Sequence, residues 1–283
     1  MDIIDEHLET VERLLPDEDG DGLLAHRGQF HDVVVGAERV ICFARTDAAG
    51  ARLPERAAVL RSLAELDLGF RTPVPLDEGR EPEPYLVLSR VPGSPLDAAE
   101  LADPRVLRAA AAQFARLLRG LARAGSSGIA GRTLPHTAPN RWQEFAAGVR
   151  EELFPLMSDA GRERAGRELD ALDSLPHLTS AVVHGDLGGE NVLWETVDGL
   201  PRLNGVVDWD EVAMGDQAVD LAAIQASYGE ELVRKIVEHE AGSLRQEAER
   251  VPVIRGTFAL QQALFALRDG DRAELDDGLL GYR

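Results

Sequence analysis

The chain has 283 residues, of which 44% are hydrophobic, so it is long enough to bury a core as one large domain or as two packed lobes. Its 50 acidic residues outweigh 30 basic ones and give a formal net charge of −20, which argues against nucleic acid as a partner. The single cysteine, Cys42, excludes an internal disulfide, and no apolar run approaches membrane-spanning length. We therefore expect a cytoplasmic protein that does not act at a membrane.

The first ninety residues alternate short apolar runs with turns. Helical spacing of apolar residues predicts helices over 3–15 and 52–66. Apolar runs predict strands over 23–25, 33–35, 40–43 and 85–88. The segment 28–32 predicts a tight loop that begins at Gly28. The backbone amides of such a loop can face phosphates, although an ordinary hairpin explains these residues equally well.

The composition changes after the fourth of these strands. Pro92, Gly93 and Pro95 predict a boundary between an N-terminal lobe, residues 1–91, and a C-terminal lobe, residues 92–283. Beyond it, helices are predicted over 104–124, 142–157, 162–175, 219–227, 231–239 and 252–267. The expected fold class is α+β, with a small lobe of β-sheet plus helix and a larger, mainly helical lobe.

One stretch inside the second lobe, residues 180–220, carries polar residues at strand ends. A strand over 181–183 leads into His-Gly-Asp (184–186), and Asn191 opens a second strand. A turn over 197–199 sends the chain back along 203–207 to Asp-Trp-Asp (208–210). The hairpin should place Asp208 beside Asp186 and Asn191. Two carboxylates and one amide suit Mg2+, which prefers hard oxygen ligands and keeps substrate phosphates in its shell.

The order HGDLGGEN, VVDWDEV and GDQAVDLA resembles the catalytic and metal segments of the aminoglycoside phosphotransferase family, which has a kinase-like fold. Further stretches, among them PYLVLSRVPGSPL and IRGTFALQQALFALRDGD, are similar to the members that act on viomycin and capreomycin, and the similarity covers nearly the whole chain. It implies a bilobal protein-kinase-like fold. It also implies an ATP- and Mg2+-dependent O-phosphotransferase that inactivates a basic cyclic peptide antibiotic by phosphorylating a seryl hydroxyl.

The resemblance also implies roles for single residues. Asp186 would orient the acceptor hydroxyl, and Asn191 and Asp208 would bind Mg2+. The connector backbone at Ser89 and Val91 would bond the adenine edge, and the loop at Gly28 would cover the nucleotide. Two further sets are predicted. Supporting residues of the catalytic loop are His184, Asp216 and Asp220; acidic residues that would bind the cationic acceptor are Glu190, Asp210, Glu211, Asp269 and Asp271.

The sequence departs from the kinase-like pattern in the N-terminal lobe. Cys42 stands where a strand lysine would hold the α- and β-phosphates, and Arg56 stands where its glutamate partner would lie. The chain's one lysine, Lys235, lies far along the sequence. We therefore predict that Arg56 meets the phosphates, with Arg45 as the second choice because strand alternation turns it away from Cys42. The alternative is that Arg56 points to solvent, as helical arginines usually do.

Two other functions remain open at this point. The same chemistry could serve another cationic acceptor, such as an aminoglycoside. A non-catalytic, kinase-like drug-binding protein would explain the lost lysine, but such a protein has no need to keep Asp186, Asn191 and Asp208 together. No obligate protein partner is predicted.

Overall fold

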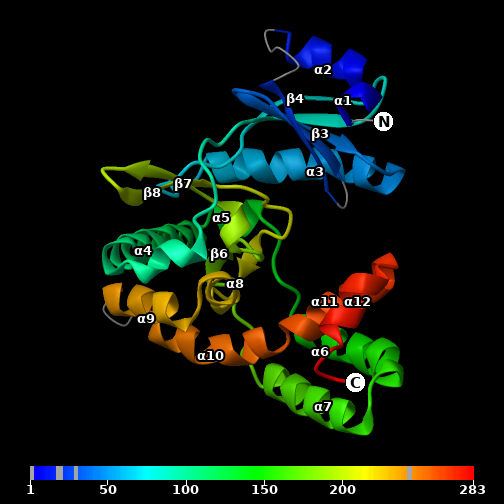
Figure 1. Cartoon of the computed structure of the whole chain (residues 1–283), viewed down its shortest axis with the longest axis vertical. Coiled ribbons are helices and arrows are strands. Elements are labelled where there is room, and N and C mark those ends of the chain that lie inside the picture. The colour runs from blue at the N-terminus through cyan, green and yellow to red at the C-terminus, as the bar shows by residue number, and fades with distance from the viewer. Residues whose placement is uncertain (1–2, 17–21, 29–30, 241–243) are drawn as a thin grey trace.

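In the computed structural model, the described part of the chain comprises residues 3–16, 22–28, 31–240 and 244–283. Its upper portion is a five-stranded antiparallel sheet with helices on both faces, and its lower portion is mostly helical (Figure 1). No helix among the described residues is long and apolar enough to cross a membrane. The predicted α+β class and kinase-like architecture are confirmed by this arrangement and by the comparisons reported below.

The N-terminal sheet has the strand order β1-β2-β3-β5-β4, and every pair is antiparallel. Its side chains alternate between two cores. One face, with Ile41 and Phe43 at its centre, packs under the N-terminal helices, whereas Cys42 and Leu86 face α3 on the other side. The elements are α1 (Ile3–Glu6), α2 (Leu8–Leu14), β1 (Leu24–Arg27), β2 (His31–Val35), β3 (Arg39–Ala44), α3 (Asp47–Ala64), β4 (Pro75–Gly79) and β5 (Tyr85–Ser89).

Three details of this lobe differ from prediction. Helix α3 begins at Asp47 rather than at residue 52, because the Thr46 hydroxyl caps it by accepting a hydrogen bond from the backbone N–H of Ala49 at 3.1 Å. The predicted helix over 3–15 is divided into α1 and α2. Strand β4 lies in a proline-punctuated stretch where no strand was predicted. Of the predicted loop 28–32, residues 29 and 30 lie outside the described part.

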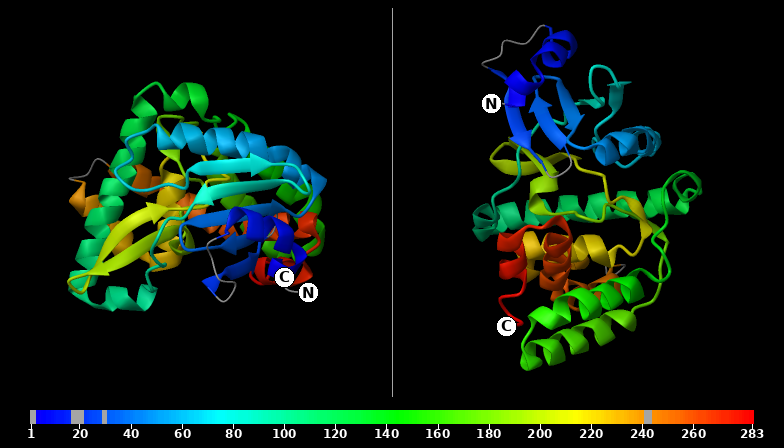
Figure 2. Two further views of the ribbon diagram at one scale, coloured as in Figure 1. Left: turned by 90° about the horizontal axis from the view of Figure 1, so that it is seen from above. Right: turned by 90° about the vertical axis from the view of Figure 1, so that its right-hand side faces the viewer.

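The C-terminal lobe is built around the long, buried helix α4 (Pro104–Ser126), which was predicted correctly. Helices α8 (Ala218–Tyr228), α9 (Glu230–His239) and α10 (Arg245–Gly256) pack in the same core. A second core joins α6 (Arg141–Gly148), α7 (Asp159–Asp173), α11 (Phe258–Asp269) and α12 (Arg272–Gly278), and of these α6 and α7 lie at the end of the molecule away from the sheet (Figure 2). The short elements are η2 (Ala98–Ala102), α5 (Ala130–Thr133), η3 (Val149–Leu153) and η4 (Phe154–Leu156).

Two predicted helices of this lobe are wrong as single elements. The segment 142–157 is α-helical only up to Gly148. The two short turns η3 and η4 follow, and Pro155 inside η4 has no N–H to donate to a preceding turn, so the α-helix cannot resume there. The segment 252–267 is two helices that meet at Thr257. The Thr257 hydroxyl donates to the Ile254 carbonyl at 2.7 Å and so satisfies the end of α10 locally.

Two small sheets connect the lobes. Strand β6 (Ala181–Val183) pairs with β9 (Ala213–Gly215), and β7 (Val192–Val197) pairs with β8 (Leu200–Val206), each antiparallel. The β7–β8 hairpin lies between the N-terminal sheet and α4 (Figure 2). It also holds the connector: the N–H of Ser94 donates to the Trp194 carbonyl at 3.0 Å, and Gly93, at φ 118°, lies so close that a Cβ would be 2.7 Å from that oxygen. The lobe boundary at residue 91 stays a prediction.

Candidate active site

The loop that follows β6 is fixed by buried hydrogen bonds on both sides. His184 is fully buried; its Nε2 donates to the Val207 carbonyl at 2.8 Å, and its Nδ1 accepts from the backbone N–H of Asp186 at 3.2 Å. Burial lowers the pKa of His184 to about 4, so the imidazole is neutral at pH 7. A neutral ring with one donor and one acceptor matches these two contacts, and it leaves no proton-accepting nitrogen for catalysis.

Asp220 holds the same loop from helix α8. Its two oxygens accept hydrogen bonds from the backbone N–H groups of His184 and Gly185, each at 3.0 Å. Asp220 is fully buried, and this burial raises its pKa to about 7 although the two donors act in the opposite direction. Gly185 has φ 93°, and a Cβ there would lie 2.6 Å from the carbonyl oxygen of Glu211, so the position requires glycine.

Asp186 and Asn191 are in contact, as the hairpin predicted. The Asn191 amide nitrogen donates to the Asp186 carbonyl oxygen at 2.8 Å and to its Oδ2 at 3.2 Å. Asn191 is buried, and η5 (Gly189–Asn191) places it at the start of β7. Asp186 reaches solvent, so its carboxylate is accessible to a substrate.

Asp208 follows β8 on the same side of the cleft. The hairpin closes there because the N–H of Val207 donates to the Asn191 carbonyl at 2.9 Å. Asp208 has φ 61°, a left-handed conformation that is uncommon for a residue with a side chain and that clusters at functional sites. Its neighbour Trp209 is buried and anchors the turn by donating from Nε1 to the Val206 carbonyl at 2.9 Å.

The carboxylates of this cluster perturb one another. Desolvation raises the pKa of Asp186, and the charges of Glu190 and Glu211 raise it further. Desolvation and Asp210 raise the pKa of Asp208, while Arg56 lowers it. Acidic groups that repel each other in a partly dry cleft favour the binding of a cation.

The donor set near Asp208 fits a hard divalent cation. Within the described residues, both side-chain hydrogen bonds of Asn191 use its amide nitrogen Nδ2, which leaves the side-chain oxygen Oδ1 for another partner, and Asp208 offers a carboxylate with a raised pKa. Amide and carboxylate oxygens without sulfur or imidazole suit Mg2+.

Arg56 points into the cleft between the lobes and not to solvent. Its Nε lies 2.6 Å from Oδ1 of Asp210, and its side chain is 18% exposed. Cys42 lies beneath it, 3% exposed. Burial opposes the charge of Arg56, but Cys42, Asp210 and Asp208 together raise its pKa. Arg45 lies on the opposite face of the sheet, where it donates to the Gly28 carbonyl at 2.6 Å.

A cavity of about 170 Å3 opens around this ion pair. It is lined by residues of both lobes, namely His31, Ala49, Arg52, Leu53, Glu55, Arg56, Val59, Pro135, Trp209, Asp210, Glu211 and Val212. His31 and Arg52 were not among the predicted site residues. The signal for His31 was strand alternation, since His31 and Val33 share the face that carries Cys42. Arg52 lies one turn before Arg56 on α3.

The residues predicted to hold a nucleotide base lie at the connector. Ser89 is the last residue of β5, and its hydroxyl accepts a hydrogen bond from the N–H of Val74 at 2.9 Å. Val91 is buried, and within the described part of the chain its backbone N–H and C=O have no hydrogen-bond partner. Gly28 closes the β1–β2 turn by donating to the His31 carbonyl at 2.9 Å.

The predicted acceptor-binding carboxylates do not form one cluster. Glu190 and Glu211 are exposed beside Asp186, whose pKa both raise. Asp210 is occupied by Arg56. Asp271 caps α12 by accepting from the N–H groups of Ala273 and Glu274, and no hydrogen bond or ion pair in the described residues links Asp269 or Asp271 to the catalytic loop.

Within the described residues, Asp216 makes no hydrogen bond or ion pair with the loop from His184 to Asp186, which it was predicted to support. It forms a bidentate pair with Arg250, at 2.7 Å for each of two hydrogen bonds, and caps α8 through the N–H of Ala218. It therefore ties α10 to the start of α8. Gln217, the next residue, is buried and donates to the Leu118 carbonyl at 2.6 Å, which links the same helix to α4.

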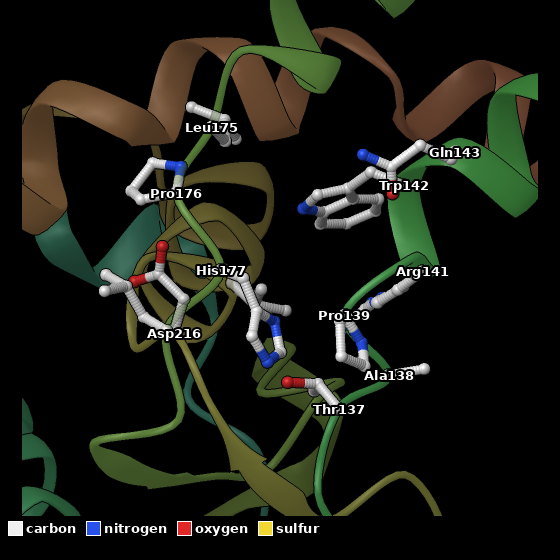
Figure 3. Close-up of a pocket in the computed structure, with 12 residues that line it drawn as sticks. Thr137, Ala138, Pro139, Arg141, Trp142, Gln143, Leu175, Pro176, His177 and Asp216 are labelled. Atoms are coloured by element: carbon white, nitrogen blue, oxygen red, sulfur yellow. The ribbon is translucent and has the colours of Figure 1, made fainter.

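A second pocket, of about 40 Å3, lies between the start of α6 and the segment 175–178 (Figure 3). The guanidinium of Arg141 lies 4.3 Å from the ring centre of Trp142 there, and His177 lies between Thr137 and Asp216. Burial lowers the pKa of Arg141, against the charges of Glu211 and Asp220. Lys235 is remote from both pockets, on α9, with Nζ 2.9 Å from Oε2 of Glu238.

Comparisons with known proteins agree with this geometry. Residues 22–251 match the model of the phosphotransferase enzyme family. The chain is 63% identical to the viomycin phosphotransferase of Streptomyces vinaceus over the whole of both chains. Its fold is similar to the GDP complex of aminoglycoside 2'-phosphotransferase-IIIa (TM-score 0.82, 18% identity, 98% of this chain and 96% of that one). A macrolide 2'-phosphotransferase type I is also similar (TM-score 0.75, 22% identity, 100% and 98%).

Proposed function

Since the chain belongs to the phosphotransferase enzyme family, we propose that it transfers the γ-phosphoryl group of ATP to a hydroxyl of a viomycin-type cyclic peptide antibiotic. The observation that carries this proposal is the identity with viomycin phosphotransferase along both full chains. The hydrogen bond between Asn191 and Asp186, and the nearness of Asp208, whose pKa the charge of Asp186 raises, support the reaction type. Because the reaction consumes ATP, the cytoplasm remains the proposed location.

In this proposal the carboxylate of Asp186 accepts a hydrogen bond from the acceptor hydroxyl and directs its oxygen at the γ-phosphorus. The new O–P bond forms as the bond to the β–γ bridging oxygen breaks, ADP leaves, and the hydroxyl proton passes to Asp186 and then to solvent. Phosphoryl transfer is loose, so orientation contributes more than strong basicity. Asn191 holds the orientation of Asp186 through its amide nitrogen.

The nucleotide would lie between the lobes. The backbone of Val91 offers a donor and an acceptor to the adenine edge. Asn191 and Asp208 would hold Mg2+, which neutralises phosphate charge when bound. Arg56 supplies a cation from the N-terminal side in place of the strand lysine.

The acceptor is proposed to be cationic because acidic residues surround Asp186. Glu190 and Glu211 lie close enough to raise its pKa, and the chain as a whole carries a net charge of −20. A basic peptide would relieve this repulsion. Asp269 and Asp271 remain weaker candidates, since Asp271 already caps a helix.

The test is ADP release by the purified protein with ATP and Mg2+ in the presence of viomycin, capreomycin, kanamycin and a macrolide. We expect turnover with the two peptides, and mass spectrometry should locate the phosphate on a seryl hydroxyl. Turnover with kanamycin or the macrolide alone would move the proposal to another acceptor. Tight peptide binding without any ADP release would favour the second candidate, a drug-binding protein, which Cys42 in place of lysine suggests.

A further inference from the structure

The ion pair between Arg56 and Asp210 connects the two lobes at the place where the nucleotide phosphates would lie. Arg56 belongs to α3 of the N-terminal lobe, and Asp210 is two residues after Asp208. The Nε and Nη1 atoms of Arg56 are buried, and neither has a hydrogen-bond partner within the described residues, so the 2.6 Å contact of Nε with Asp210 is an ion pair without hydrogen-bond geometry. The charge of Asp210 therefore holds the guanidinium, while its N–H donors remain available to another anion.

His31 lines the same cavity. Its Nε2 is buried and has no hydrogen-bond partner in the described part of the chain. Burial and the neighbouring Arg56 and Arg52 keep the imidazole neutral by lowering its pKa to about 4, although Asp210 acts in the opposite direction. A neutral imidazole still donates one hydrogen bond. Arg56, Arg52 and His31 thus present two cations and one neutral donor from the N-terminal lobe to a space that closes against Asp210 and Glu211.

We propose that Asp210 is a placeholder for the oligophosphate of the nucleotide: it pairs with Arg56 across the cleft, and nucleotide binding transfers Arg56 from Asp210 to the phosphates, where His31 adds a neutral donor. This rests on the proposed function and deepens it. The side chain of Arg56 is only 18% exposed, and a guanidinium largely removed from water is costly without a counter-charge. Asp210 supplies that charge before the nucleotide arrives, so the two anions compete for one cation.

Competition between Asp210 and the phosphates for Arg56 makes a prediction that repulsion between Asp210 and the phosphates does not. Removal of the Asp210 charge should tighten the binding of ADP, but only while Arg56 is present to be released. Mere repulsion between Asp210 and phosphate would tighten binding equally whether or not Arg56 is there. The two explanations separate in a double-mutant cycle, which isolates the coupling of two residues.

The experiment is a calorimetric titration of the full chain with ADP, without metal, for the parent, Asp210→Asn, Arg56→Gln and the double variant. We expect Asp210→Asn to lower the Kd several-fold, Arg56→Gln to raise it about tenfold or more, and the double variant to match Arg56→Gln. Glu211→Gln, which removes a charge from the same cavity without an ion pair to Arg56, should give the same change in both backgrounds. Equal tightening by Asp210→Asn in both backgrounds, or a raised Kd in the parent background, overturns the placeholder role.

The donor role of His31 is tested in the same titration by comparing a variant that lacks a side-chain donor with one that keeps it. His31→Leu should weaken ADP binding several-fold, and His31→Gln, which keeps a side-chain donor, should stay near the parent. Equal loss in both variants would remove the donor role. Turnover of the parent with peptide, ATP and Mg2+ is measured separately: a parent that turns over but shows no coupling loses only this inference, whereas a parent that neither turns over nor binds ADP in the presence of Mg2+ loses the proposed function as well.

Discussion

The two sides of the cleft hold their polar groups in different ways. On the C-terminal side, the loop from His184 to Asp186 is fixed by hydrogen bonds to a fully buried histidine and a fully buried aspartate. On the N-terminal side, Arg56 is held by one ion pair that spans the lobes, and Arg52 is exposed. We call the C-terminal side, where hydrogen bonds fix the polar groups, the geometric side, and the N-terminal side, where electrostatic attraction holds Arg56, the charge side.

The difference shows which part of such a site tolerates change. A hydroxyl must be aimed at phosphorus within a narrow range, so the loop that carries Asp186 needs a rigid backbone. A phosphate needs only a cation within reach, because Coulomb attraction depends on distance and not on where the side chain is anchored. Under our proposal, Arg56 on the facing helix can therefore supply the cation that a strand lysine at the position of Cys42 would otherwise provide.

The comparison would be most sharply tested at Asp186. Asp186→Asn keeps the size of the side chain but weakens acceptance of the hydroxyl proton, so kcat should fall by about 10³-fold, within the range for a positioned proton-accepting group. Nucleotide affinity, measured by titration with ADP, should stay close to the parent. If kcat remains within a few-fold of the parent, Asp186 does not orient the hydroxyl.

The rigidity of the loop can be tested through pH. The pKa of Asp220 is raised to about 7, so its contribution to the free energy of unfolding is present below its unfolded pKa near 4 and is lost as pH rises to 7. The pKa of His184 is lowered to about 4, so its contribution is present above its unfolded pKa near 6.5 and is lost as pH falls to 4. Between pH 4 and pH 6.5 the contribution of Asp220 to the free energy of unfolding falls with pH, and the contribution of His184 rises with pH.

Asp220→Asn should remove the pH dependence that Asp220 gives to the free energy of unfolding and leave that of His184. We expect the free energy of unfolding of the variant, relative to the parent, to rise by about 1 kcal/mol per pH unit between pH 4 and 6.5. Urea unfolding at several pH values measures it. Asp173→Asn, which changes an exposed carboxylate at the end of α7, serves as the control and should give a flat difference. A flat difference for Asp220→Asn as well would mean that Asp220 is not the buried acid described here.

On the charge side, loss of a cation should weaken ATP use without abolishing it. Arg56→Gln should lower kcat/KM for ATP by about 10- to 100-fold, since hydrogen bonds to charged groups contribute about 1.5–3 kcal/mol. The matched control is Arg61→Gln on the same helix, because Arg61 is exposed and pairs with Glu78 at 3.0 Å. ATP kinetics unchanged by Arg56→Gln would assign the phosphates to another group.

The smallest effect concerns capture of the acceptor. Raising salt from about 0.05 to 0.5 M shortens the screening length from about 14 to 4 Å, so KM for a basic peptide should rise several-fold while kcat changes less. The double variant Glu190→Gln/Glu211→Gln should show a weaker salt dependence. A KM that does not vary with salt would argue against electrostatic capture.

Much of the geometric side could be predicted from the sequence, because a strand–loop–strand pattern brings Asp186 and Asn191 together whatever surrounds them. The bracing contacts were less visible. Asp216 and Asp220 belong to the same motif, GDQAVDLA, but Asp216 forms its hydrogen bonds with Arg250 on α10. This partner lies 34 residues away, and no local pattern indicates it. The breaks at Gly148 and Thr257 were missed because the apolar spacing continues across both points.

The charge side was predicted only in part. The absent lysine pointed to Arg56, but its pairing with Asp210 depends on how the lobes close, which neighbouring residues in the sequence do not encode. His31 and Arg52 were overlooked for the same reason. The acidic residues 269 and 271 were selected by charge alone, and capping, a backbone requirement, accounts for Asp271.

The placement of the one lysine has a practical consequence for chemical labelling. Reagents that acylate a nucleotide-site lysine find no side-chain amine in this cleft, since Lys235 lies on α9 on the far side of α4. Among side chains, amine-reactive dyes or surfaces should therefore attach only through α9 and leave the cleft open. The thiol of Cys42 beneath Arg56 offers no substitute target, because it is 3% exposed and burial raises its pKa.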